Sequence, residues 1–341
     1  MNRLLIRADA NSEIGHGHMM RCLALAQAWR ELRGPVTFVM ASPSREVRQR
    51  VEAEGVDVVA QDAPAGTEED ARETCAAAER SGASWIVLDG RAFSPEFQEQ
   101  LRAARPLLVL DDEARAPRLC ADLVLNQNVH ARPADYEGRA PGARLLLGCY
   151  YVLLRREFHD RRSRDIPPRA TKLLVTLGGS DPDNVTAAVL RALHGADLAG
   201  AQVRVIAGGS NRYVAELRTE AARSSFAMEV RENVSDMPAQ MEWADLAISG
   251  SGSTCWETAY LGLPAIVVVL SSDQKKIAEE LERRGIAVSL GWHRDGLQRL
   301  PGELARLMSD RAERQRMSHL GQELVDGQGA ARVVAEMEAR R

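Results

Sequence analysis

The chain has 341 residues, of which 45% are hydrophobic and 27% are charged, which is the composition of an ordinary globular protein of about two domains. This excludes the disordered, collagen-like and mini-protein classes. Lys and Arg number 44 against 48 Asp and Glu, and the formal net charge of −4 argues against a dominant surface for nucleic acid or anionic membrane.

The five cysteines are scattered and form no Cys-x-x-Cys pair: Cys22, Cys75, Cys120, Cys149 and Cys255. This pattern predicts neither structural zinc nor a disulfide framework, and it favours reduced thiols in the cytoplasm. The apolar run at the N-terminus is too short for a signal peptide, and every other apolar run is too short to span a bilayer. We therefore expect no membrane anchor.

Short runs of Val, Ile and Leu alternate with helical patterns through the first half of the chain. Strands are predicted at 4–6, 36–40, 56–60, 85–88 and 107–110, and helices at 18–33, 45–54, 68–81 and 95–104. Continuous rather than alternating apolarity is typical of strands that are buried on both faces. The alternation of strands and helices predicts a parallel sheet with right-handed crossovers.

The first predicted strand leads into a loop with two histidines. Residues 14–22 read Ile-Gly-His-Gly-His-Met-Met-Arg-Cys, in which Gly15 and Gly17 permit a tight turn close to a ligand. His18 falls in the first turn of a helix, whose positive end favours the neutral imidazole, a competent general base. We predict His18 as the catalytic base and His16 as a weaker candidate; the alternative is that both are polar loop residues. Asp9, at the end of the strand, is placed to orient an imidazole nitrogen, or equally to cap a turn or helix.

A polar, basic stretch at 159–171 contains the Pro167-Pro168 pair and is the best linker candidate. We therefore expect a first domain over 1–160, which carries the histidine loop, and a second over 161–341. Further strands are predicted at 173–177, 203–207, 246–248 and 265–270, and a helical tail over 297–341, broken at Gly327 and Gly329. The pattern predicts two doubly wound, Rossmann-like domains that face each other across a cleft.

Two glycine-rich loops follow predicted strands of the second half. Residues 173–184 end in Gly-Gly-Ser-Asp-Pro-Asp-Asn, whose amides suit a phosphate, although the Gly-Lys-Ser/Thr of a P-loop is missing. Residues 248–257 read Ile-Ser-Gly-Ser-Gly-Ser-Thr-Cys-Trp-Glu, and their amides and hydroxyls suit a diphosphate at a helix start. Glu257 is then within reach of a ribose, or else serves the helix dipole. Gln274, after the next strand, is predicted to reach the same cleft.

Taken in order, these motifs resemble the UDP-sugar hydrolases of pseudaminic acid biosynthesis. The resemblance rests on Arg7-x-Asp9, on residues 15–22, on 250–257 with 262–264, and on shorter matches at 110–113, 125–128, 135–138 and 324–330. It covers essentially the whole chain. The chain departs from the family at Asp89-Gly90-Arg91, where members often carry Asp-His-Tyr, and this leaves the exact sugar open.

The resemblance implies an α/β structure of the GT-B type, related to the MurG-type glycosyltransferases. It implies hydrolysis of UDP-2,4-diacetamido-2,4,6-trideoxy-β-L-altropyranose to the free sugar and UDP, a step that serves flagellin glycosylation and cell-surface polysaccharide. The family's catalytic histidine falls on His18. The substrate-binding residues predicted are Arg7, Gly15, Gly17, Arg21, Asn126, Asn128 and Tyr136. The nucleotide-binding residues predicted are Gly178, Gly179, Ser180, Val234, Ser251, Gly252, Ser253, Thr254, Glu257 and Gln274.

The proposed hydrolysis needs fewer catalytic groups than the reaction of an ordinary glycosidase, which uses two carboxyl groups as acid and base. UDP is stable as an anion, so one base that activates water suffices, and we predict an inverting hydrolysis without metal or cofactor. The predicted partners are the UDP-sugar substrate and the UDP product, and we expect no nucleic acid partner. The chain is expected to be a monomer or a weak oligomer. Two alternatives stay open: a GT-B glycosyltransferase that uses a UDP-sugar donor, and a non-catalytic nucleotide-sugar-binding protein.

Overall fold

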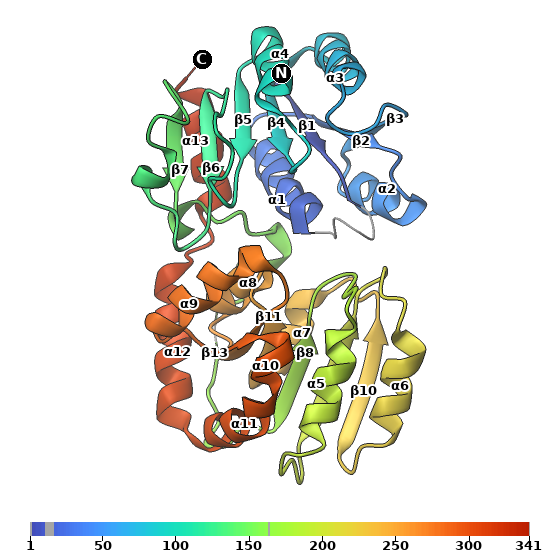
Figure 1. The fold of residues 1–341 in the computed structure, drawn as a ribbon, viewed down its shortest axis with the longest axis vertical. Helices are drawn as coiled ribbons and strands as arrows, with labels where there is room; N and C mark the ends of the chain where they lie inside the picture. Colours follow the sequence, from blue (N-terminus) through green and yellow to red (C-terminus); the bar gives the residue numbers. More distant parts are fainter. Residues whose placement is uncertain (1, 11–16, 163, 341) are drawn as a thin grey trace. The chain divides into compact units, whose positions relative to one another are not determined.

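The computed structural model describes residues 2–10, 17–162 and 164–340 of the chain. It divides into two compact units, Met1–Arg156 with Gly327–Arg341, and Glu157–Asp326 (Figure 1). Each unit has its own parallel sheet, one of seven strands and one of six. The predicted fold class, two doubly wound α/β halves, is confirmed.

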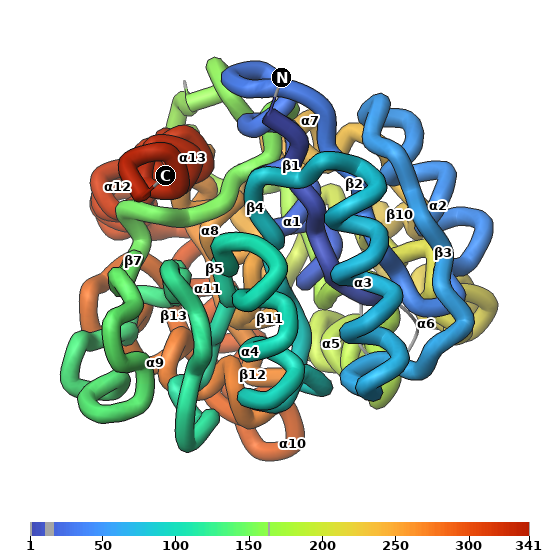
Figure 2. The backbone as a smooth tube through the Cα atoms, turned by 90° about the horizontal axis from the view of Figure 1, so that it is seen from above, coloured from blue at the N-terminus to red at the C-terminus, as the bar shows by residue number. Residues whose placement is uncertain are grey.

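The first unit is built on a sheet with the order β3-β2-β1-β4-β5-β6-β7, in which all neighbours are parallel. Its strands are β1 (Arg3–Ala8), β2 (Val36–Ala41), β3 (Asp57–Gln61), β4 (Ala83–Asp89), β5 (Leu107–Leu110), β6 (Leu123–Asn126) and β7 (Arg144–Leu147). Its α-helices are α1 (Gly17–Leu32), α2 (Arg45–Glu52), α3 (Glu68–Ser81), α4 (Pro95–Ala104) and α13 (Gly329–Glu338). The strand order reverses at β1, which lies between β2 and β4 (Figure 2). In such sheets ligands bind beyond the carboxyl ends of the strands at the reversal.

Alternate residues of the central strands face opposite layers of helices. On β1, Leu4 and Ile6 belong to the core that includes α1, whereas Leu5 belongs to the core that includes α3 and α4. On β4, Trp85 and Val87 lie on the α1 side. Both faces of these strands are therefore covered by helices, and this is why they read as continuous apolar runs.

The last helix, α13, belongs to the first unit, although the sequence placed the whole tail in a domain over 161–341. Its residues Val333 and Met337 are completely buried in the same core as Trp29 of α1. The apolar stripe of α13 is thus satisfied by the first sheet's helical layer, and this corrects the expected domain assignment of the tail.

The second unit is built on a sheet with the order β10-β9-β8-β11-β12-β13, again entirely parallel. Its strands are β8 (Lys172–Thr176), β9 (Gln202–Ala207), β10 (Ala227–Glu232), β11 (Leu246–Gly250), β12 (Ala265–Val269) and β13 (Ala287–Trp292). Its α-helices are α5 (Val185–Leu193), α6 (Val214–Ala222), α7 (Met237–Trp243), α8 (Thr254–Leu261), α9 (Lys275–Arg283), α10 (His293–Gly296), α11 (Leu300–Ser309) and α12 (Arg311–Leu324). Here the order reverses at β8, between β9 and β11.

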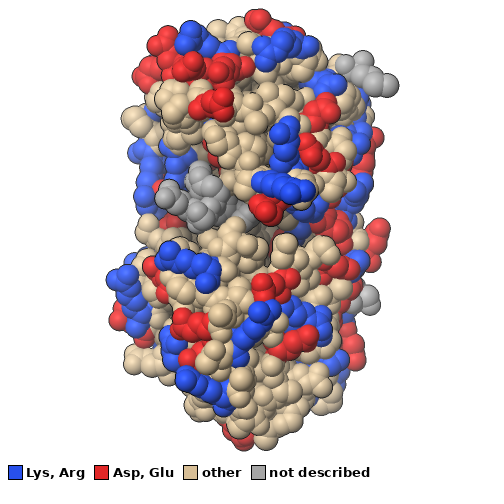
Figure 3. All heavy atoms as spheres, turned by 90° about the vertical axis from the view of Figure 1, so that its right-hand side faces the viewer, with Lys and Arg blue, Asp and Glu red and all other residues tan. Residues whose placement is uncertain are grey.

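The surface carries both signs of charge side by side. On the face drawn in Figure 3, Lys and Arg side chains are interspersed with Asp and Glu. In the part of the chain that the structure describes, no helix is long and apolar enough to cross a membrane.

Candidate functional site

His18 lies in the first turn of α1, just after the loop that follows β1. Its ring Nδ1 is 2.7 Å from Oδ1 of Asp89, and its side chain is 20% exposed. Because a carboxylate only accepts, the contact with Asp89 requires a proton on Nδ1, so that Nε2 carries the lone pair when the ring is neutral. Arg21 Nη2, which only donates, then lies 3.0 Å from Nδ1 without a hydrogen bond to it. No hydrogen bond between described residues uses Nε2. The geometry is that of a base held in one tautomer by a buried acid.

Asp89 ends β4 and is completely buried. It accepts from Nε of Arg21 at 2.7 Å and from Nη2 at 2.6 Å, and the thiol of Cys22 lies 3.4 Å from its Oδ2. Burial raises the pKa of Asp89, but the charges and hydrogen bonds of Arg21 and His18 outweigh burial and hold that pKa well below its ordinary value. Asp89 is therefore ionised at neutral pH and available to stabilise a positive imidazole ring.

Arg21 joins this pair to a second carboxylate. Its Nη1 donates to both oxygens of Asp112 at 2.7 Å, and its Nη2 lies 3.0 Å from Nδ1 of His18. Asn128 donates from Nδ2 to Oδ1 of Asp112 at 2.9 Å. Burial raises the pKa of Asp112, yet the Arg21 charge more than offsets this and lowers it. The cluster His18, Asp89, Arg21, Asp112 and Asn128 thus brings one guanidinium between two carboxylates beside the imidazole.

The predicted partner of His18 has to be corrected. Asp9 does not touch His18: its Oδ1 accepts from Arg7 Nη1 at 2.7 Å and from the backbone amide of Ala41 at 2.7 Å. The carboxylate at His18 is Asp89. Asp9 follows β1 directly and is bound to Arg7, whereas Asp89 ends the neighbouring strand β4 and meets His18 and Arg21 of α1.

Arg7 was predicted to bind substrate, but it is completely buried. Its Nε and Nη2 donate to the two oxygens of Asp70 on α3, at 2.8 and 2.9 Å, and its Nη1 donates to Asp9. With its guanidinium occupied by these carboxylates, Arg7 is a structural residue that joins β1 to α3.

Replacing Arg7 by Met is therefore expected to destabilise the fold by about 3–5 kcal/mol, because it leaves the buried carboxylate of Asp70 without its partner. Urea denaturation measures this loss. The matched control is Arg3→Met on the same strand, since Arg3 pairs with Asp57 at 2.6 Å on the surface, where loss of a pair is worth about 1 kcal/mol or less.

The same ion pair sets a pH dependence. Burial raises the pKa of Asp70, and Arg7 with other donors lowers it below the ordinary 3.8. A lowered pKa in the folded state means that the stabilisation is present above about pH 4 and is lost as the pH falls further. Stability of Arg7→Met should therefore fall less steeply on acidification below pH 4 than that of the wild type, and equal slopes in the two proteins would contradict this role of the pair.

Of the other predicted substrate residues of this unit, three are buried in contacts with one another, one is exposed and one lies outside the described residues. Asn126 donates from Nδ2 to the hydroxyl of Tyr136 at 2.9 Å and accepts from the amide of Asn128 at 3.0 Å, and all three side chains are buried. They support the end of β6 from inside. Gly17 is exposed at the start of α1. Gly15 and His16 lie outside the described residues.

In the second unit, the predicted nucleotide residues gather at the carboxyl edge of the sheet. Gly178 follows β8 with φ +97, and its neighbour Gly179 approaches Gly208 after β9 so closely that a Cβ on Gly208 would be 2.3 Å from the Gly179 oxygen. Ser180 continues this loop and is half-buried. The positive φ explains glycine at position 178, where a Cβ would meet nothing within 4 Å, and close backbone approach explains glycine at position 208.

The loop after β11 is tied to the loop after β12. The Ser251 hydroxyl is buried and lies 3.3 Å from both the Val268 oxygen and Oε1 of Gln274, which also accepts from the Leu270 amide at 3.1 Å. A Cβ on Gly252 would lie 3.4 Å from Nε2 of Gln274. Ser251 is therefore used inside the protein, whereas the Gln274 amide nitrogen stands beside the glycine loop.

Helix α8 starts directly after this loop. Ser253 is its exposed N-cap residue, Thr254 its first residue, and Glu257 lies half-buried in its first turn. Val234 is half-buried beyond the end of β10, next to Asn233, whose side chain would be 3.2 Å from a Cβ on Gly209. The loops after five strands thus meet at one edge, which has a helix N-terminus suited to an anion.

Two residues of the first cluster, Asp89 and Asp112, were missed as site residues. Each comes at the carboxyl end of a strand, Asp89 as the last residue of β4 and Asp112 two residues beyond β5. Asp89 ends the strand beside the reversal of strand order and Asp112 follows the next strand of the sheet, and these positions were the available signal.

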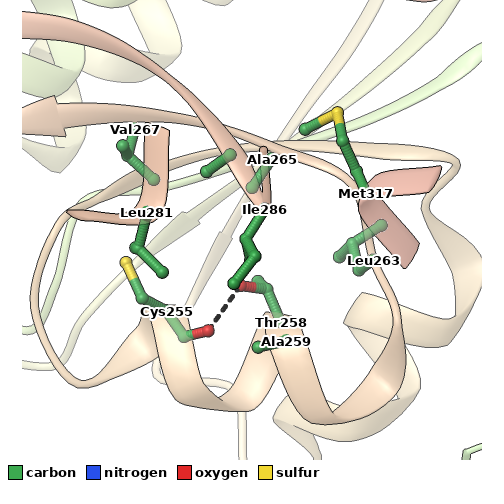
Figure 4. Close-up of a pocket in the computed structure, with 10 residues that line it drawn as sticks. Cys255, Thr258, Ala259, Leu263, Ala265, Val267, Leu281, Ile286 and Met317 are labelled. Carbon is green, nitrogen blue, oxygen red and sulfur yellow. Dashed lines mark hydrogen bonds between the residues drawn. The ribbon is translucent and has the colours of Figure 1, made fainter. Parts of the chain in front are cut away.

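The cavity in Figure 4 is separate from these two groups of loops. It holds about 10 Å³, near what one water requires, and is lined mainly by apolar side chains behind α8, among them Leu263, Leu281 and Met317. Thr258 donates to the Cys255 oxygen at 3.0 Å across one side of it. It is a packing gap in the core. Among the described residues no group of three His, Cys, Asp or Glu is arranged to hold a metal ion.

Comparison with known proteins agrees with this architecture. Residues 173–332 match the glycosyltransferase family 28 C-terminal domain. Over 287 residues the chain is 24% identical to the uncharacterized protein MJ1062 of Methanocaldococcus jannaschii, covering 82% of this chain and 58% of that one. Over 187 residues it is 25% identical to a UDP-2,4-diacetamido-2,4,6-trideoxy-beta-L-altropyranose hydrolase of Campylobacter jejuni, covering 54% of this chain and 63% of that one. The matches therefore span about three fifths of these relatives' own lengths.

Among solved structures, MurG of Acinetobacter baumannii superimposes with a TM-score of 0.69 at 15% identity, covering 99% of this chain and 100% of that chain. At this identity the likeness concerns the fold. The chain therefore has the GT-B fold, and its second half matches the C-terminal domain of glycosyltransferase family 28.

Proposed function

We propose that the chain hydrolyses UDP-2,4-diacetamido-2,4,6-trideoxy-β-L-altropyranose to UDP and the free sugar, with inversion, as a cytoplasmic step of pseudaminic acid biosynthesis. The observation that carries the proposal is the contact of 2.7 Å between His18 Nδ1 and the buried Asp89, which leaves Nε2 as a base. The name of the Campylobacter relative supports the reaction, and the match to a glycosyltransferase domain supports an activated sugar as substrate.

In this reaction water attacks the anomeric carbon while the bond from that carbon to the diphosphate oxygen breaks. Nε2 of His18 accepts the proton of the water, and the ring becomes an imidazolium that Asp89 stabilises through Nδ1–H. The electron pair of the broken bond leaves with UDP, which is stable as an anion and needs no strong acid. The imidazolium then returns its proton to solvent.

The second unit would hold the UDP. The amides around Gly178–Ser180, and those around Gly252–Thr254 at the start of α8, would suit the diphosphate because backbone N–H groups at a glycine turn or helix start carry partial positive charge. The uracil would meet the backbone near Val234. Glu257, one turn into α8, would accept hydrogen bonds from the ribose hydroxyls.

A glycosyltransferase with the same donor is the second candidate, favoured by the match of residues 173–332 to a glycosyltransferase domain. The two reactions differ in whether water or an acceptor hydroxyl attacks. The test is to incubate the protein with UDP-diacetamido-trideoxyhexoses and no acceptor, and to follow UDP release and the anomer formed by NMR. Stoichiometric UDP with an inverted free sugar is expected, whereas UDP release that requires an added acceptor would favour the transferase.

Replacing Glu257 by Gln is expected to weaken UDP binding by about 10-fold or more, because hydrogen bonds to a charged acceptor contribute roughly 1.5–3 kcal/mol. The ribose is remote from the reacting carbon, so KM should rise more than kcat falls. Calorimetric titration of UDP measures the effect.

The matched control is Glu279→Gln on α9, an exposed glutamate whose nearest basic group, Lys275, is 3.9 Å away. UDP affinity of this control should equal that of the wild type. If Glu257→Gln binds UDP normally and only melts at a lower temperature, Glu257 serves the helix and is removed from the nucleotide site.

A further inference from the structure

Of the five residues of the His18 cluster, His18 and Asp112 reach solvent, whereas Asp89, Arg21 and Asn128 are buried. The side chain of Asp89 is completely buried and that of Arg21 is 9% exposed, whereas His18 is 20% and Asp112 is 28% exposed. The two nitrogens of one guanidinium connect them, since Arg21 Nη2 lies 3.0 Å from His18 Nδ1 and Nη1 lies 2.7 Å from both Asp112 oxygens. The imidazole of His18 and the carboxylate of Asp112 are therefore neighbouring groups that a ligand can reach from solvent.

Asp112 still has acceptor capacity. An ionised carboxylate has about four lone-pair positions. Two donor groups use them here, Arg21 at 2.7 Å to both oxygens and Asn128 at 2.9 Å to Oδ1. Oδ2 is thus contacted by Arg21 Nη1 alone among the described residues. The Asp112 side chain that carries the remaining lone pair of Oδ2 is held by Arg21 and Asn128 and is 28% exposed.

We propose that Asp112 binds the sugar of the substrate by accepting a hydrogen bond from a hydroxyl or amide N–H group on a carbon near the reacting one. The proposal rests on the proposed function and deepens it, because it makes the first unit select the sugar. An acceptor-only group with a negative charge selects substituents that donate and rejects deoxy positions and carboxylates at that place.

The competing role for Asp112 is purely internal, as a counter-charge that keeps Arg21 in place. The two roles predict different measurements. A counter-charge acts on His18 through Arg21 and changes the rate of the chemical step. A sugar contact changes how much tighter the UDP-sugar binds than UDP alone.

The experiment compares His18→Asn with the double variant His18→Asn/Asp112→Asn, so that the sugar is not cleaved during titration. UDP and UDP-2,4-diacetamido-2,4,6-trideoxy-β-L-altropyranose are each titrated by calorimetry. The quantity measured is the dissociation constant of UDP divided by that of the UDP-sugar, and this ratio isolates the contribution of the sugar. We expect this ratio to fall by about 10-fold or more when Asp112 is replaced, with the dissociation constant of UDP unchanged.

The control is His18→Asn/Asp62→Asn, because Asp62 is an exposed aspartate of the same unit. Its ratio should equal that of His18→Asn. If Asp112→Asn lowers the melting temperature sharply, Asp112→Glu keeps the charge for Arg21 but moves the carboxylate, and it should lose the sugar contribution while UDP binding is retained.

The outcomes separate the proposals. A ratio unchanged by both Asp112 variants overturns the sugar contact and leaves the proposed function standing. A UDP-sugar that binds His18→Asn no more tightly than UDP also overturns the contact. If the wild type does not bind UDP at all, the proposed function itself is overturned.

Discussion

His18→Asn is expected to lower kcat by about 10²–10⁴-fold, the usual contribution of a general base. The loss follows from the geometry, because Nε2 is the ring atom left with a lone pair once Nδ1 is bound to Asp89 at 2.7 Å. The dissociation constant of UDP should stay the same, since the predicted nucleotide loops belong to the second unit. UDP release from the UDP-sugar measures kcat, and calorimetry measures UDP binding.

His319→Asn is the matched control, because His319 lies on α12 with a side chain 73% exposed and its nearest acid is Glu323 at 3.6 Å. This variant should keep the rate and UDP affinity of the wild type. Near-normal kcat in His18→Asn would show that the histidine is structural and would end the proposed mechanism.

The central strands could be predicted because they are buried on both faces. The run 107–110 is apolar at every position, and it forms β5, whose four residues are all buried. Four strands were not predicted, namely β6, β7, β10 and β13. Burial does not account for all of them, since β6 is buried at each of its four positions, but β10 lacks this property. β10 (Ala227–Glu232) is an edge strand with alternating charged residues, and its positions are exposed or half-buried. Pairing with β9, rather than burial, makes it a strand.

The tail was assigned to the wrong half for a related reason. The apolar spacing of 329–338 predicts a helix and a buried stripe, but an amphipathic pattern does not identify the surface that covers it. In the structure that surface includes Trp29 and Cys22 of α1, about 300 residues earlier in the chain. Contacts between such distant segments leave no local signal.

The position of His18 was predictable, but its carboxylate partner was not identified. Asp9 is the nearer acid in sequence, yet it shares the side of β1 with Leu5 and Arg7, which face the α3 layer. Asp89 is two residues beyond Val87, which faces α1. The alternation of side chains along two parallel strands thus decides which acid meets the histidine, and this requires knowing on which face α1 packs.

Asp89→Asn should therefore lower kcat by up to about 10⁴-fold, a loss comparable to that of His18→Asn. The amide is isosteric, but its NH₂ group donates where the carboxylate accepted, so it favours the tautomer that carries the proton on Nε2 of His18. It also removes the charge that stabilises the imidazolium. Asp112 stays paired with Arg21 at 2.7 Å, so the guanidinium keeps one of its two acids. UDP affinity should be unchanged.

A readout other than rate separates this positioning role from simple loss of stability. Because the pKa of Asp89 is lowered in the folded protein, its stabilisation is present above about pH 4 and is lost as the pH falls, so Asp89→Asn should lose less stability than the wild type on acidification below that point. The matched variant is Asp9→Asn, which disturbs the Arg7 network but leaves His18 in its tautomer, and it should keep kcat within about 10-fold of the wild type. If Asp9→Asn lost as much activity as Asp89→Asn at equal thermal stability, the tautomer of His18 would not depend on Asp89, and the dyad would have to be abandoned.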